Sequence, residues 1–91
     1  MAQILRLYVA GNTQKSNKAI ANLKKYCEGE LRGLYTIEII DLLEHPQLAE
    51  EDQIIAVPTL IRKLPTPVRI LVGDLSDKTN VLVGLNMVHP T

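Results

Sequence analysis

The sequence predicts a small α/β domain with its elements in the order β-α-β-α-β-β-α. Two β-rich apolar runs, residues 3–10 and 34–43, flank a segment whose apolar residues recur at helical spacing. Two more apolar runs, residues 54–61 and 68–72, lie on either side of a Pro-Thr-Pro segment. Proline occurs at the starts and edges of strands, so this pattern favours a hairpin. From the length of 91 residues we expect one domain that spans the whole chain.

The composition excludes several classes of protein. The chain has no Phe or Trp, so its core must be built from Leu, Ile and Val. Ten basic and ten acidic residues cancel, so no net charge attracts the chain to nucleic acid or to a membrane surface. A single cysteine excludes an internal disulfide and is typical of a reducing compartment. No apolar segment approaches the roughly 20 residues of a membrane span and no secretory pattern is present, so we expect a cytoplasmic protein.

The first half of the chain is predicted to form a βαβ unit. Residues 3–10 contain a single charge, as in a central strand that is covered on both faces. The helix that follows is capped by Asn12, Thr13 or Ser16. Its apolar face holds Ala19, Ile20, Leu23 and Cys27. Residues 34–43 form the second strand, and a right-handed crossover makes the two strands parallel.

The second half begins with a short acidic helix and continues with the hairpin. Pro46 suits the first turn of a helix over residues 47–53. Pro58 should open a strand over residues 59–63, and Pro67 should open the other strand of the hairpin. The sequence leaves the peptide bond before Pro58 open between cis and trans.

The tail, residues 75–91, carries conflicting signals. A cap at Asp74 or Ser76 favours a helix. Its apolar face would hold Leu75, Leu82 and Leu85. The run VLVGLNMV, residues 81–88, would equally suit a strand. Gly84 lies in this disputed run, and its replacement by Ala should favour the helix by about 1 kcal/mol. With the helix, the order of elements is that of a thioredoxin-like fold.

No enzyme chemistry is evident. A thioredoxin-type enzyme needs a nucleophilic cysteine at the start of the first helix, where residues 11–16 contain none. Cys27 falls at the far end of that helix, where the dipole does not stabilise a thiolate, and is expected to be a small buried hydrophobe. His45 and His89 have no cysteine at ligand spacing, so neither metal nor cofactor is expected. The acidic run at residues 50–52 is interpreted as a solvated helix face.

Basic residues gather around the predicted hairpin. They are Arg62, Lys63 and Arg69. Without aromatic neighbours they make a weak platform for nucleic acid. Two interpretations remain open for them, a rim for protein docking and a plain solvated edge.

Several motifs resemble the KaiB family of cyanobacterial circadian-clock proteins. They are YVAGNT (8–13), PQLAEEDQIIAVPTL (46–60), LPTPVRILVGDLSD (64–77) and VLVGL (81–85). The resemblance implies a non-enzymatic protein that binds the ATPase KaiC, modulates its phosphorylation cycle, sequesters KaiA and displaces the kinase SasA. It also implies a fold switch between a homotetramer and a thioredoxin-like monomer, which share the N-terminal half and rebuild the C-terminal half.

The resemblance directs attention to two groups of residues. The candidate partner-binding residues are Lys18, Arg62, Lys63 and Arg69. The candidate hinge residues of the switch are Pro58, Pro65, Pro67, Gly84 and Asn86.

The chain departs from the common family pattern at several positions. Glu38 and Gln53 stand where the family often has lysine, Ile70 where it often has a second arginine, and Asn86 where it commonly has aspartate. A KaiB paralogue outside the core clock is therefore one alternative. Two others are a redox enzyme on a thioredoxin scaffold, which the missing CxxC opposes, and a thioredoxin-like adaptor that binds another partner by strand addition without switching.

Overall fold

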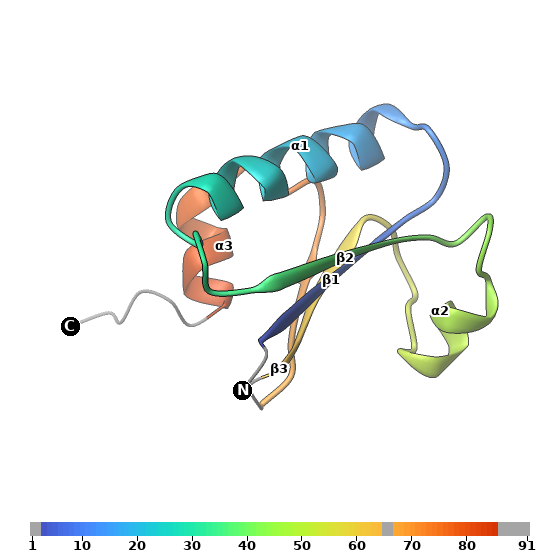
Figure 1. Ribbon diagram of the computed structural model, residues 1–91. Coiled ribbons are helices and arrows are strands. Elements are labelled where there is room, and N and C mark those ends of the chain that lie inside the picture. The colour runs from blue at the N-terminus through green and yellow to red at the C-terminus, as the bar shows by residue number, and fades with distance from the viewer. Residues whose placement is uncertain (1–2, 65–66, 86–91) are drawn as a thin grey trace.

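The computed structural model describes residues 3–64 and 67–85 and confirms the predicted order of elements (Figure 1). The elements are β1 (Ile4–Val9), α1 (Gln14–Glu28), β2 (Thr36–Asp41), α2 (Gln47–Glu51), β3 (Thr59–Leu64), β4 (Arg69–Val72) and α3 (Lys78–Gly84). This is the thioredoxin-like α/β arrangement that the sequence predicted.

The four strands form one mixed sheet in the order β2-β1-β3-β4. β1 and β2 are parallel, with Leu5 opposite Ile37, as the predicted βαβ crossover requires. β3 runs antiparallel to both β1 and β4, and Ile61 lies opposite Ile70. The predicted hairpin is therefore confirmed, although its turn at residues 65–66 lies outside the described residues.

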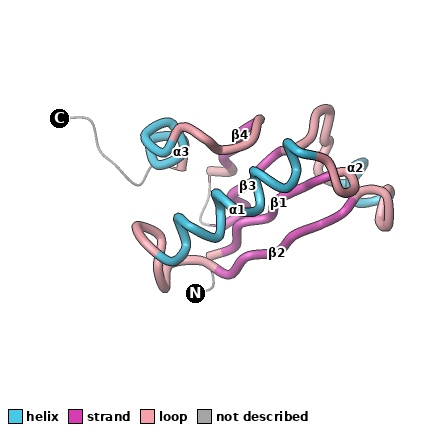
Figure 2. Tube along the Cα trace, turned by 90° about the horizontal axis from the view of Figure 1, so that it is seen from above, coloured by secondary structure: helices cyan, strands magenta, loops and turns pink. Residues whose placement is uncertain are grey.

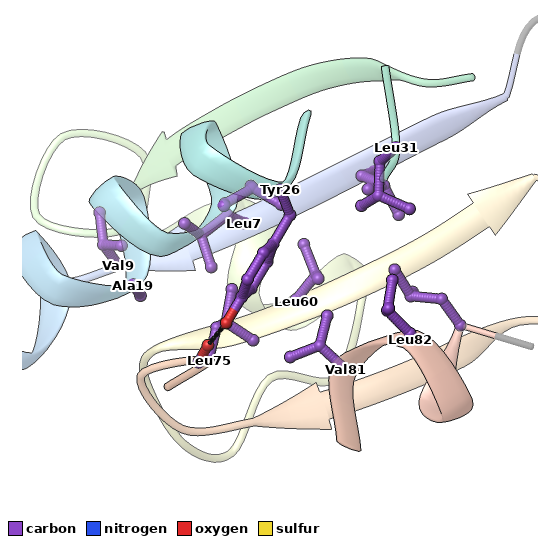
Figure 3. Close-up of a cluster of buried hydrophobic side chains, with 12 residues drawn as sticks. Leu7, Val9, Ala19, Tyr26, Leu31, Leu60, Leu75, Val81 and Leu82 are labelled. Atoms are coloured by element: carbon purple, nitrogen blue, oxygen red, sulfur yellow. Dashed lines mark hydrogen bonds between the residues drawn. The ribbon is translucent and has the colours of Figure 1, made fainter. Parts of the chain in front are cut away.

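The two faces of the sheet are covered differently. α1 and α3 pack on one face, against Leu5 and Leu7 of β1 and Leu60 of β3. Figure 2 shows the arrangement of these elements, and Figure 3 shows Leu7 and Leu60 in the cluster. Side chains alternate along a strand, so Tyr8 points to the opposite face. There its hydroxyl contacts the carbonyl of Leu48 in α2 at 3.4 Å. The short helix α2 therefore lies on the face away from α1, and it covers only part of it.

Local chemistry explains where α1 begins and ends. Of the three predicted caps Thr13 is the one used, because its Oγ1 accepts the amide of Ser16 at 3.1 Å. Gly29 ends the helix. Tyr26, which the predicted apolar face did not include, is buried and donates its hydroxyl to the carbonyl of Leu75 at 2.5 Å (Figure 3). Cys27, predicted to be a small buried hydrophobe, is partly buried.

The disputed tail is helical in this structure. Its cap is Asp77, whose Oδ1 accepts the amide of Asn80 at 3.1 Å. The predicted caps Asp74 and Ser76 were wrong, because the carboxylate of Asp74 accepts the amide of Ser76 before the helix starts. The buried side chains are Leu75, Val81, Leu82 and Leu85. In this structure residues 81–84 are therefore helical and not a strand, and residues 86–88 lie outside the described residues.

Candidate protein-docking surface

Exposed apolar side chains follow the edge strand β4. Val68 lies just before the strand, Ile70 and Val72 lie within it, and Ile70 is 58% exposed. We call these three residues the β4 strip. The amide of Gly73 donates to the carbonyl of Pro58 at 2.9 Å, so alternation along an antiparallel ladder directs the main-chain groups of Ile70 and Val72 away from β3. The strip therefore combines apolar side chains with a strand edge that a partner strand could extend.

A hollow of about 150 Å³ adjoins this strip. It is lined by Asp52, Gln53, Ile54, Ile55, Thr59, Ile70 and Val72. Ile55 is 98% exposed at its rim. An isolated exposed isoleucine is ordinary, but apolar side chains grouped beside an open strand edge are typical of a docking surface.

A polar network on the same face fixes α2 against the sheet. Asp52, directly after α2, accepts hydrogen bonds from the Tyr8 hydroxyl and from Nη1 of Arg6, the latter at 3.2 Å. Nζ of Lys63 on β3 lies 3.0 Å from the other carboxylate oxygen. Arg6 also pairs with Glu38 of β2 at 3.2 Å. The side chain of Asp52 is only 11% exposed, so one largely buried carboxylate ties the end of α2 to β1 and β3.

The network shifts the acidity of its members in opposite directions. Burial disfavours the Asp52 carboxylate, but the hydrogen bonds from Tyr8 and Lys63, together with the charge of Arg6, outweigh it and lower the pKa of Asp52. Burial, followed by the hydrogen bond to Asp52, raises the pKa of the Tyr8 phenol. Near neutral pH the site therefore holds an ionised Asp52 beside a neutral Tyr8.

This network corrects one prediction and reveals what the sequence missed. The acidic run was interpreted as solvated, which is right for Glu50 and Glu51 and wrong for Asp52. The alternation of β1 placed Arg6 and Tyr8 on one face. Nothing in the sequence indicated that the carboxylate 44 residues further along would meet that face.

The four predicted partner-binding residues do not form one patch. Lys18 is exposed on α1, and Lys63 is on the opposite face of the sheet in its pair with Asp52. Arg69 is exposed on β4. Arg62 is only 5% exposed, because the alternation of β3 turns it to the face that α3 covers. In this fold its guanidinium is therefore covered and not accessible to a docking partner.

The candidate hinge residues have mixed environments. Pro58 is buried at the start of β3, and the Val57–Pro58 peptide bond is cis. Pro67 is exposed before β4. Gly84 ends α3. The other two, Pro65 and Asn86, lie outside the described residues.

The positions that depart from the common family pattern also have structural roles. Glu38 is the partner of Arg6 in the ion pair on β1 and β2. Gln53 has a positive φ of 55°, directly after Asp52. Ile70 belongs to the β4 strip, so an arginine at that position would place a charge in the middle of the strip.

The thiol is poorly placed for redox chemistry. Cys27 lies one residue before the end of α1, and burial raises the pKa of its thiol. A reactive cysteine needs the opposite, a helix N-terminus and a lowered pKa. A groove between α1 and β2 surrounds it with Leu23, Lys24, Glu28, Ile37 and Ile39.

The described part of the chain contains neither a cluster of metal ligands nor a membrane-spanning helix. Within residues 3–64 and 67–85, no three metal-ligating side chains gather into a possible metal site. Over the same ranges, no helix is both long and apolar enough to cross a membrane.

Two solved structures have the same fold at low sequence identity. The N-terminal domain of Synechococcus elongatus SasA superposes with a TM-score of 0.75 at 20% identity, covering 100% of this chain and 90% of that domain. Oxidised mitochondrial thioredoxin 3 from Saccharomyces cerevisiae also gives 0.75, at 16% identity, covering 94% and 78%. These likenesses show that the fold is thioredoxin-like.

Sequence relatives are much closer. "Circadian clock oscillator protein KaiB" from Prochlorococcus marinus is 54% identical over 86 residues, which cover 94% of this chain and 72% of the relative. The protein of the same name from Synechococcus elongatus is also 54% identical over 86 residues, covering 94% and 84%. A family model described as the KaiB domain matches residues 6–87. From these matches, this chain belongs to the KaiB family.

Proposed function

We propose that this chain is a non-enzymatic clock regulator that acts in the cytoplasm by binding a KaiC-type ATPase and modulating its phosphorylation cycle. The observation that carries the proposal is the 54% identity over 86 residues to relatives named for the circadian clock oscillator. Because the aligned region covers 94% of this chain, the likeness involves the domain as a whole and not one short motif.

The proposal includes competition with a SasA-type kinase. The N-terminal domain of SasA and this chain share one fold over nearly their full lengths. Two domains of one shape can occupy the same docking site on a ring, so that binding of one displaces the other. Capture of KaiA is the further step, and Glu38, where the family often has lysine, leads us to expect weaker KaiA binding than in those members.

The proposal also includes a fold switch of the C-terminal half, with a homotetramer as the other state. Support comes from α3, which is seven residues long and contains Thr79, Val81, Val83 and Gly84, all weak helix formers. A helix of this length is marginal without tertiary contacts. Two packings of one segment that differ by a few kcal/mol would leave the minor one at roughly 0.1–10%.

Binding to a purified KaiC-type ATPase ring tests the proposal. We expect the full chain to bind the immobilised ring and to compete with a SasA-type domain. Charge reversal at exposed Lys18 should slow association several-fold at low salt, because charges at the rim of an interface steer encounter. Lys24→Glu is the matched control, since Lys24 borders the groove between α1 and β2 instead. Absence of binding by the wild-type chain at micromolar concentrations would refute the proposal.

A constitutive adaptor that binds by strand addition is the second candidate. The β4 strip beside an open strand edge favours it. Ile70→Lys would place a charge in that strip and should abolish strand addition while leaving β3 and β4 paired, because Ile70 is exposed. The secondary structure of an adaptor would stay the same on dilution, and it would bind in that one fold. The secondary structure of a switching regulator would change on dilution.

A further inference from the structure

The buried arginine of β3 holds the end of α3. Nη1 of Arg62 donates to the carbonyl of Leu85, which follows the helix, at 2.5 Å. Nη2 donates to the carbonyl of Pro67, just before β4, at 2.9 Å. One guanidinium therefore joins three segments of the chain: β3, the start of β4 and the C-terminal end of α3.

The carbonyl at Leu85 particularly needs such a donor. The last four carbonyls of a helix have no partner within it. A cation at this end also interacts favourably with the negative end of the helix dipole. Leu85 is fully buried, so water does not readily replace the missing donor.

The cost of burying Arg62 indicates that it has a specific role. Among the residues that the structure describes, no carboxylate pairs with Arg62. Its Nε, also buried, has no hydrogen-bond partner there. A buried charge without a counterion is unfavourable unless its hydrogen bonds offset the loss of water. The two bonds to carbonyls are what this structure offers in compensation, and both exist only while α3 and the start of β4 are in their present places.

We propose that Arg62 acts as a clamp: its hydrogen bonds set the fraction of molecules in which residues 78–84 are helical. α3 is too short and too poor in helix formers to be stable alone, so it depends on its buried side chains and on this clamp. When the helix is lost, the acceptor at its end moves away and Arg62 is left buried with fewer bonds. The clamp would regulate the same fold switch that the proposed function includes. Only its expected effect on partner binding rests on that proposed function.

Amide hydrogen exchange on the full chain tests the clamp. The probes are the amides of Val81 and Leu85, which donate to Asp77 at 3.0 Å and to Val81 at 2.9 Å, with the β1 amides as an internal reference. In Arg62→Met, exchange of the α3 probes should rise about tenfold or more, as expected when hydrogen bonds from a charged group are lost, with β1 unchanged.

Arg69→Met is the matched control for loss of charge. Arg69 lies directly opposite Arg62 in the β3–β4 ladder, yet it is exposed. We expect the exchange rate of the α3 probes in Arg69→Met to differ from that of the wild-type chain by less than about twofold. Equal effects of the two substitutions, or no effect of Arg62→Met, would overturn the proposal.

Arg62→Lys keeps the test decisive if Arg62→Met fails to fold. Lysine retains the charge but lacks the planar fork that reaches two carbonyls. We expect it to accelerate exchange of the α3 probes by an intermediate factor without affecting β1. Uniform acceleration across the sheet, or none at all, would show that Arg62 is not a clamp for α3.

Association with a KaiC-type ATPase separates this proposal from the proposed function. If the helical state is the one that docks, the association rate of Arg62→Met should fall by the same factor as the population of that state. Faster exchange with unchanged association would support the clamp and refute docking through the helical state. If the wild-type chain does not bind, the proposed function fails, and the exchange experiment still decides the clamp.

Discussion

At the scale of single residues, Asp52 has the most varied contacts on the open face. Its carboxylate accepts from Tyr8 and Arg6 of β1 and pairs with Lys63 of β3. Its neighbour Glu51 is exposed and ends α2. Two adjacent acidic residues thus have opposite roles, because the chain turns between α2 and β3 and directs only the second toward the sheet.

Asp52→Asn should destabilise the fold by about 1–3 kcal/mol at pH 7, because it removes the charge that three donors share. The pKa of Asp52 is lowered in the folded state, so its contribution is present at neutral pH. That contribution declines as the pH falls through about 3.9, the ordinary value for aspartate, and is lost below the lowered folded pKa. Urea unfolding followed by circular dichroism at pH 7 and at low pH measures both effects.

Glu51→Gln is the control for Asp52→Asn. It removes the same charge one residue earlier, from an exposed side chain, and should change stability by less than about 0.5 kcal/mol. If Asp52→Asn kept its deficit undiminished at low pH, the loss would come from packing and not from the ionised carboxylate.

The thiol of Cys27 is expected to have no part in partner binding or in redox chemistry. Cys27→Ser should leave binding of a KaiC-type ATPase unchanged, and the wild-type chain should not reduce insulin disulfides. The reason is that burial raises the pKa of the thiol at the wrong end of α1. An insulin-reduction assay on both proteins checks this, and a reductase signal that disappears with Cys27 would contradict the non-enzymatic interpretation.

At the scale of elements, α3 shows how tertiary contacts decide what local propensity leaves open. The run at residues 81–85 is β-rich, yet residues 81–84 are helical here, with Val81, Leu82 and Leu85 buried in the core. Gly84 was expected to oppose the helix through its flexibility alone. The structure adds a second reason for glycine there, because a β-carbon at Gly84 would collide with Cδ2 of Leu71 on β4.

Gly84→Ala should therefore not deliver the full 1 kcal/mol of helix propensity that the sequence predicted. Displacement of Leu71 costs free energy of a similar size, so we expect a net change between no effect and about 1 kcal/mol of destabilisation. In a Leu71→Ala background the obstacle is gone, and the same substitution should stabilise by up to about 1 kcal/mol. Chemical unfolding of the four proteins of this double-mutant cycle measures the coupling; additive effects would show that Leu71 moves aside freely.

For the molecule as a whole, the order of elements could be predicted from the sequence, and the candidate docking surface could not. Periodicity and the positions of proline were sufficient for the strands and for two of the helices. They were insufficient for Arg62 and Lys63, adjacent residues that β3 directs to opposite faces. Leu60 and Ile61 are both buried, one on each face of β3. The pattern therefore did not indicate whether the arginine or the lysine would be covered. That depends on where α3 packs, which was the element left open.

The proposed fold switch would couple the fold of the chain to its assembly. If the C-terminal half switches between a homotetramer and the thioredoxin-like monomer, dilution must shift the chain toward the monomer by mass action. Secondary structure should then change with mass along the same concentration dependence, because α3 belongs to only one of the two states. Light scattering or native mass spectrometry, with circular dichroism on the same samples, measures both.

Arg62→Met should move the transition to lower concentration, since it weakens the helical monomer, and Arg69→Met should not. A chain whose mass changes while its spectrum stays constant would be an oligomer without a fold switch, and the adaptor would then be the better description.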